Sequence, residues 1–190
     1  MNAARKRLLT TRELTILALI AALLVGTKMT LNLPLRIPGH SGIFWMAYLV
    51  IGRGIVRKRG AGALLGLVSG LLAVIVVGGR EGLLVWVKYF APGVVMDLGA
   101  LLSRERLDSA VMGVLVGATA NAAKLTSSLI VSLLLGIPVG YLAVGLGLAA
   151  VTHVVFGAIG GWLGALVLRS IQRLRLPGMH DRNAREGSAG

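Results

Sequence analysis

Among the ionisable side chains inside apolar stretches of the sequence, four are candidates for a function: Lys88, Asp97, Lys124 and His153. At the centre of a bilayer-spanning helix each would cost roughly a few kcal/mol, so such groups usually face a cavity or a partner. A rise of about 1.5 Å per residue places Lys88 and Lys124 in the same half of the membrane and Asp97 in the other half. Two lysines in one dry pocket repel each other unless an anion lies between them. Glu81, or an acidic group on a bound substrate, is the candidate anion.

The neighbours of these lysines have the character of a binding site. Trp86 and Tyr89 offer flat surfaces, and Asn121, Lys124 and Ser128 share one helix face by their spacing. Aromatic walls with a few aimed polar groups are typical of small-molecule sites. The candidate substrate-binding residues are therefore Lys124, Lys88, Asn121, Glu81, Trp86, Tyr89 and His153.

Structural roles for the same residues stay open. Lys88 would then extend to the surface with Glu81 as its partner. Asp97 would pair with a basic residue near the cytoplasmic face, and His153 would be a neutral hydrogen-bonding group between helices. Trp45 and Trp162 are expected to be membrane-interface anchors.

Catalytic motifs are absent from the sequence. It contains no HExxH, GxSxG or P-loop pattern, no cysteine, and three histidines of which His153 alone lies deep in an apolar stretch. We therefore expect no catalytic residues, no metal site and no cofactor bound to this chain. Without a Walker A sequence the chain cannot hydrolyse ATP, so any active transport must take its energy from a partner or an ion gradient.

The composition indicates a membrane protein. The chain has 190 residues, of which 56% are hydrophobic and 14% charged, against about 45–50% and 25% in soluble domains. Six apolar runs approach the length of about 20 residues that a spanning helix needs. They are 14–29, 42–56, 60–77, 83–102, 110–135 and 139–168. The sequence predicts an all-α polytopic membrane protein: a bundle of six transmembrane helices in one domain, 1–170, and a basic, partly disordered tail, 171–190.

The basic residues predict the topology. The net charge is +13, yet the charges form short clusters between the apolar runs, which argues against a nucleic-acid partner. The N-terminus, the second and fourth loops and the tail hold 15 of the 20 Lys and Arg residues. Positive charge stays inside, so both termini are predicted to be cytoplasmic in a multi-pass protein of the cell membrane. We expect run 14–29 to be a retained helix rather than a removed signal peptide. A five-helix count is the rival, because run 42–56 is short.

Small residues recur at four-residue spacing along four of the runs. Such stripes allow helices to approach closely, and packing within the molecule is the simplest interpretation of each. They are Ala18, Ala22 and Gly26; Gly62, Gly66 and Gly70; Gly113 and Gly117; and Gly157, Gly161 and Ala165.

The length, the six helices, the cytoplasmic termini and the AxxxA pattern of Ala18 and Ala22 together resemble a substrate-binding S component of the energy-coupling factor (ECF) transporters, over residues 10–170. The resemblance implies capture of a vitamin or vitamin precursor near the outer face. It also implies a site closed by loop 31–41, which adds His40 to the candidates. Ala18, Ala22 and Gly26 would dock on a transmembrane coupling (T) protein that joins two ABC ATPases, the subunits that use ATP, in a prokaryotic cytoplasmic membrane.

The resemblance does not extend to a particular substrate. The chain begins Met1-Asn2-Ala3 and lacks the N-terminal Met-His of cobalt-type members. The paired lysines favour an anionic substrate, whereas a cationic one would need Glu81 or Asp97. A non-transporting assembly or interaction protein and a solitary secondary transporter remain as alternatives, with an intramembrane enzyme using His153 and Asp97 behind them.

Overall fold

The computed structural model describes residues 9–30, 39–77, 82–138, 140 and 145–175, and these residues form helices and turns without a strand. The predicted all-α class with six α-helices is therefore confirmed for the described part of the chain. The elements are α2 (Thr11–Thr30), α3 (Gly42–Ile55), α4 (Ala61–Val77), the 3-10 turn η1 (Gly82–Leu84), α5 (Val85–Leu102), α6 (Ala110–Leu134) and α8 (Leu146–Arg175).

The sixth helix differs from its prediction. The first five apolar runs match α2 to α6 closely, but α8 begins at Leu146 rather than at residue 139. Gly145 has a φ of +89°, a left-handed conformation that an α-helix cannot pass through. At its other end α8 continues to Arg175, beyond residue 170, where the membrane domain was predicted to end. The sequence offers no helix breaker before Pro177.

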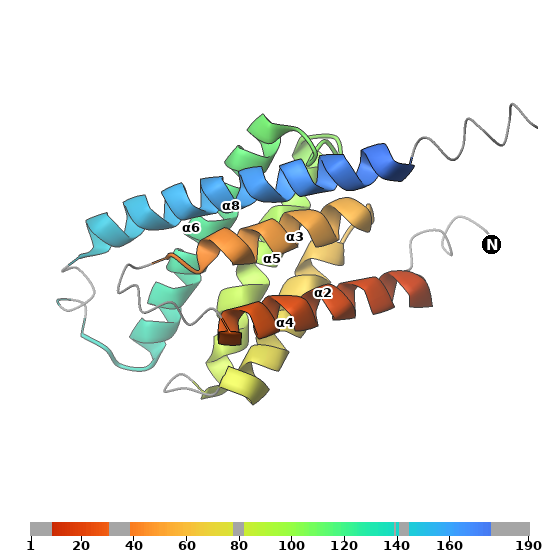
Figure 1. Ribbon diagram of the computed structural model, residues 1–190. Helices are drawn as coiled ribbons and strands as arrows, with labels where there is room; N and C mark the ends of the chain where they lie inside the picture. Colours follow the sequence, from red (N-terminus) through yellow and green to blue (C-terminus); the bar gives the residue numbers. More distant parts are fainter. Residues whose placement is uncertain (1–8, 31–38, 78–81, 139, 141–144, 176–190) are drawn as a thin grey trace, which may run out of the picture.

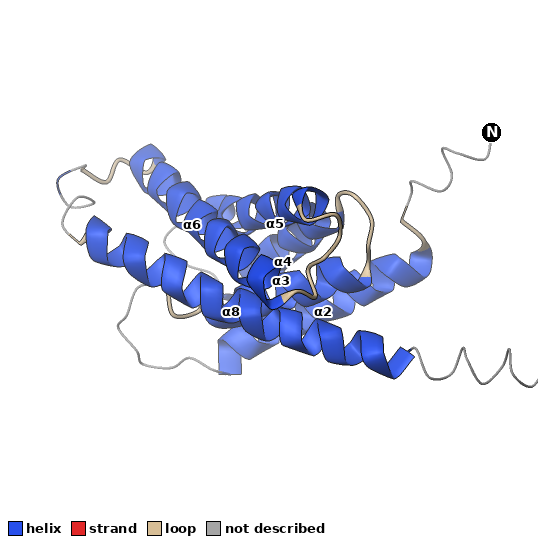
Figure 2. Cartoon of the chain, turned by 90° about the horizontal axis from the view of Figure 1, so that it is seen from above, coloured by secondary structure: helices blue, strands red, loops and turns tan. Residues whose placement is uncertain are grey.

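The helices form two layers of three (Figures 1 and 2). In one layer α3 lies between α2 and α8, and in the other α5 lies between α4 and α6. The central helix α3 also contacts α4, α5 and α6 across the layers. Thr11 of α2 and Arg175 of α8 lie at the same end of the bundle, which we call the termini end (Figure 1). The opposite end, where α3 and α8 begin, we call the far end.

The outer surface of the bundle is apolar. Four helices, α2, α5, α6 and α8, are long and apolar enough to cross a membrane. Their exposed leucines include Leu19 and Leu102, which are 60% and 86% exposed. The other two, α3 and α4, are shorter than a usual span. The prediction of six spans by length is thus confirmed for four helices.

Glycine stripes hold two pairs of helices together. The stripe of α4 lies against the backbone of α5: a methyl group on Gly62 would lie 2.7 Å from the carbonyl oxygen of Gly93. The stripes of α6 and α8 face each other in the same way, and a methyl group on Gly113 would lie 2.5 Å from the carbonyl oxygen of Gly161. Packing within the molecule is confirmed for these three stripes. Only small residues allow backbones to approach so closely.

The stripe on α2 is different, because nothing in the described structure covers it. Ala18 and Ala22 are exposed, and a methyl group on Gly26 would meet no atom within 4 Å. The buried side of α2 is formed instead by larger residues such as Leu17 and Leu24. The packing interpretation of the α2 stripe is therefore wrong within this bundle.

A buried ionic cluster fixes the termini end. The guanidinium of Arg53, with its side chain fully buried, contacts Asp97 at 2.6 Å and Glu105 through two bonds of 2.7 Å. Asp97 also accepts hydrogen bonds from the backbone N–H groups of Gly62 and Ala63. Three elements, α3, α5 and the turn after α5, are thereby joined to the first turn of α4. The prediction that Asp97 pairs with a basic residue is confirmed.

Candidate ligand-binding site

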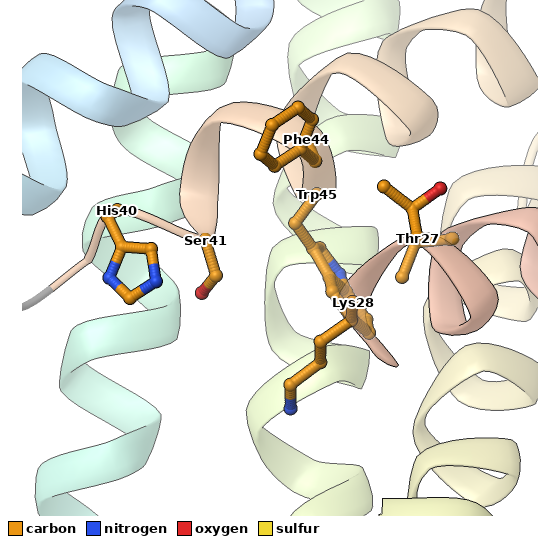
Figure 3. Close-up of a pocket in the computed structure, with 7 residues that line it drawn as sticks. Thr27, Lys28, His40, Ser41, Phe44 and Trp45 are labelled. Atoms are coloured by element: carbon orange, nitrogen blue, oxygen red, sulfur yellow. The ribbon is translucent and has the colours of Figure 1, made fainter. Parts of the chain in front are cut away.

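A cavity of about 150 Å³ opens between α2 and α3 in the half of the bundle that contains the far end (Figure 3). Both helices supply side chains at i, i+3 and i+4 spacing, the spacing of a single helix face. Three polar residues and His40 share the lining with apolar and aromatic side chains. The lining consists of Leu24, Thr27 and Lys28 from α2, and His40, Ser41, Phe44 and Trp45 from the start of α3 and the turn before it.

The lining residue Trp45 belongs to an aromatic stack with Tyr89 of α5. The rings of Trp45 and Tyr89 lie 3.9 Å apart between centroids, with an angle of 21° between their planes. Trp45 is only 2% exposed and Tyr89 is 5% exposed. The prediction that Trp45 is an interface anchor is therefore wrong: it lies in the first turn of α3, on the side that faces α5. Trp162, 43% exposed on α8, keeps a position compatible with lipid contact.

Two lysines lie beside the Tyr89 ring. The Nζ of Lys28 donates a hydrogen bond to the Tyr89 hydroxyl at 2.5 Å and lies 5.2 Å from the ring centroid. The Nζ of Lys124 lies 5.6 Å from the same centroid and 5.4 Å from that of Trp45, and donates to the Ser41 hydroxyl at 3.2 Å. Cation–π contacts of this kind gain strength when they are removed from water. The aromatic stack is therefore lined by positive charge.

Asn121 joins three helices next to Lys124. Its Nδ2 donates to the backbone carbonyl of His153 in α8 at 2.7 Å. Its side chain lies against Gly42, where a methyl group would come within 2.8 Å of the Asn121 Oδ1. His153 is half-buried, with its Nδ1 2.8 Å from the carbonyl of Ala149 in its own helix. The ring of His153 also packs against Gly39, just before α3.

Several of the predicted site residues are brought into this one region, but not all. His40 lines the cavity itself, and Tyr89, Lys124, Asn121 and His153 contact residues at the start of α3 or just before it. Trp86 is half-buried and its ring lies 5.9 Å from that of Phe90, away from the cavity lining. Lys88 is half-buried and is also outside the lining, while Glu81 lies outside the described residues. The face expected to hold Ser128 instead buries Ser127.

The sequence reasoning missed the contribution of α2 and α3. Lys28 was not among the predicted site residues, yet it lines the cavity and contacts Tyr89. Leu24, Thr27 and Lys28 at i, i+3 and i+4 match Ser41, Phe44 and Trp45 at the same spacing. This shared spacing is the sequence feature that could have indicated a binding face on each of the two helices.

The arrangement favours binding over catalysis. Asp97 is held by Arg53 at the termini end, whereas His153 lies beside Gly39 and Asn121, so the pair required for an intramembrane enzyme is not assembled. In the described part of the chain no three His, Cys, Asp or Glu side chains gather as metal ligands would. A cavity with aromatic and aliphatic walls, a hydroxyl-rich edge and the Lys28 ammonium group is suited to holding a small molecule, and the Lys124 ammonium group lies behind the lining residue Ser41.

Comparison with known proteins identifies the fold. No family model matches the chain, and no curated protein matches it in sequence. A solved structure does match: the crystal structure of an S-component of an ECF transporter, with a TM-score of 0.65 and 21% sequence identity. The match covers 96% of this chain and 98% of that chain. The chain therefore has the S-component fold, as its sequence had predicted, over nearly all of its length.

Proposed function

We propose that the chain is the substrate-capture subunit of an ECF-type importer, which binds a small vitamin or vitamin precursor at the outer face of the cell membrane for ATP-driven uptake. The observation that carries the proposal is the match of the fold over nearly the whole of both chains. The proposed substrate site is the cavity between α2 and α3, with the lining described above.

The charge distribution supports this orientation. Most Lys and Arg residues of the described chain lie at the termini end, including Arg57, Lys58 and Arg59 after α3 and Arg104 and Arg106 after α5. Basic loops remain on the cytoplasmic side of a membrane. With the termini end inside, the cavity faces the outer half of the membrane, where an importer must collect its ligand.

The uncovered stripe on α2 supports a partner. Ala18 and Ala22 are exposed, whereas the other small-residue stripes are buried against neighbouring helices. Small residues allow a second helix to approach closely, and a coupling protein in the membrane would place its helix there. The two ATPases would attach through that coupling protein and supply the energy, because this chain has no nucleotide-binding motif.

The test is a mild-detergent pull-down of the tagged chain from its native cells, with partners identified by mass spectrometry. We expect a coupling membrane protein and two ABC-type ATPases to be recovered. The double substitution Ala18→Leu and Ala22→Leu should remove them, because two large side chains would separate the helices.

The matched control places two leucines on an exposed face of α6, Thr119→Leu and Thr126→Leu, and should retain the partners. Recovery of the chain by itself, with ligand uptake that depends on an ion gradient, would point to a solitary secondary transporter. Recovery with cell-envelope assembly proteins and without ATPases would point to a non-transporting interaction protein. Either result would refute the proposal.

A further inference from the structure

We infer that the cavity binds the acidic group of a small planar ligand, a carboxylate or a phosphate, between Lys28 and Lys124 beside the Trp45–Tyr89 stack. This inference rests on the proposed function, because it specifies the class of ligand that the same site would take. It names the chemistry of the ligand without naming the compound.

The first argument is the separation of charge along the bundle. The described residues include four carboxylates, and three of them pair with Arg53 or Lys58 at the termini end: Glu13, Asp97 and Glu105. The fourth, Asp108, precedes α6 at that same end. Away from those clusters the sequence contains five cations and one acid, Glu81. Three of these cations, Lys28, Lys88 and Lys124, belong to the described residues, and each of the four described carboxylates lies at the termini end.

The second argument is the shortage of acceptors around the two lysines. An ammonium group has three hydrogens to donate. Among the described residues, Lys28 donates to one neutral acceptor, the Tyr89 hydroxyl, and Lys124 to another, the Ser41 hydroxyl. The indole Nε1 of Trp45 is buried and donates to no described residue. The N–H groups of these three side chains that make no hydrogen bond to a described residue are all donors. A ligand that satisfies them must therefore supply acceptor oxygens.

The third argument is shape. The cavity volume of about 150 Å³ equals that of engineered apolar cavities of about 150 Å³ that hold a single benzene ring. Leu24 and Phe44 are apolar members of the lining. Figure 3 shows Phe44 above Trp45 and the Lys28 ammonium group below it. One ring with one acidic substituent matches both the volume and the polar edge. A ligand with several fused rings would need the helices to separate.

The experiment measures thermal stability and calorimetric binding of the purified full chain in detergent at constant ionic strength. The probes are benzoate, its neutral isostere benzamide, and phenyl phosphate. We expect benzoate or phenyl phosphate to raise the melting temperature and benzamide to leave it unchanged, because only the acids neutralise the lysines. The stronger of the two acids identifies the group as carboxylate or phosphate.

Three variants connect the response to the proposed residues. Lys28→Met and Lys124→Met should abolish the response to the acids, whereas Lys58→Met, which removes a lysine paired with Glu13 at the termini end, should retain it. The unliganded Lys124→Met protein should also melt about 2–4 °C higher, since a buried charge without an anionic partner is removed.

Two results would overturn the inference. One is an equal response to benzamide and benzoate, and the other is no response to either acid at millimolar concentration. Both leave the pull-down unaffected, so the importer assignment would survive with a neutral or cationic ligand. Conversely, an acid response that depends on Lys124 in a chain that recovers no ATPases would leave the anion site standing and remove the importer assignment.

Discussion

Replacing Arg53 with methionine should destabilise the protein more than any other single change at a charged position. The Arg53 side chain is fully buried and makes three short contacts with two carboxylates. Methionine keeps most of the aliphatic volume, so the change removes the charge without leaving a large cavity. It leaves Asp97, which is 7% exposed, without its cation.

The size of the effect follows from the exposure of the two acids. Removing one partner of a buried ion pair typically costs about 3–5 kcal/mol. Asp97 keeps two backbone N–H donors from α4, which reduces the cost, and the Glu105 side chain is 32% exposed and can be solvated. We therefore expect a loss of about 3 kcal/mol, the lower end of that range. Arg104 and Glu105 have φ values of 51° and 63°, so the turn that holds Glu105 is strained and would relax.

The assay is unfolding of the purified protein in mixed mild-detergent and SDS micelles, followed by circular dichroism. Lys58→Met is the control, because the Lys58–Glu13 pair of 2.8 Å has both side chains about a quarter exposed and should contribute roughly 0.2–1 kcal/mol. A double-mutant cycle of Arg53→Met with Asp97→Asn should show that the two losses are not additive. An Arg53→Met loss no larger than that of Lys58→Met would refute the reasoning.

Two further predictions concern packing and topology. Gly161→Ala should lower the free energy of unfolding by about 1–3 kcal/mol in the same assay, because its methyl group would collide with the carbonyl oxygen of Gly113. Gly147→Ala in the same helix is the control and should be neutral, because its methyl group would meet no atom within 4 Å. Equal losses of stability for the two variants would contradict the close α6–α8 contact. Because the chain has no cysteine, single substitutions can report sidedness: Arg173→Cys should react with a membrane-impermeant thiol reagent only after the cells are opened, and Ile137→Cys should react in intact cells. The reverse pattern would invert the proposed orientation.

Much of the fold was predictable because it depends on the hydrophobic period and on glycine spacing. The apolar runs locate α2 to α6, and three glycine stripes locate the closest helix contacts. The boundary of α8 was not predictable, because hydropathy cannot distinguish a glycine within a helix from Gly145 in a left-handed turn. The exposure of the α2 stripe also could not be read from the sequence, since Ala18 and Ala22 have the same spacing as the buried stripes.

The site was predictable in part, for a different reason. Burial cost selected Lys124 and Asp97 because that cost depends on the residue type and its position within a helix. The same argument did not select Lys28 as a site residue, because Lys28 lies near the end of its apolar run, where a lysine can extend to the membrane surface. Which helices face each other across the cavity is a property of the tertiary arrangement. The pairing of Trp45 with Tyr89 therefore had no signal in either helix alone.

The glycine seams between α4 and α5 and between α6 and α8 have an evolutionary consequence. At Gly66, Gly93 or Gly161 the constraint is that no side chain fits, while the lipid-facing positions around them require only apolar character. Neither constraint specifies one particular large residue, so homologous chains can exchange Leu, Ile, Val and Phe over most of their surface and keep the same backbone. Divergence of this kind erodes detectable sequence similarity faster than it changes shape. A chain that matches no family model can therefore still superpose on an S-component over 96% of its residues.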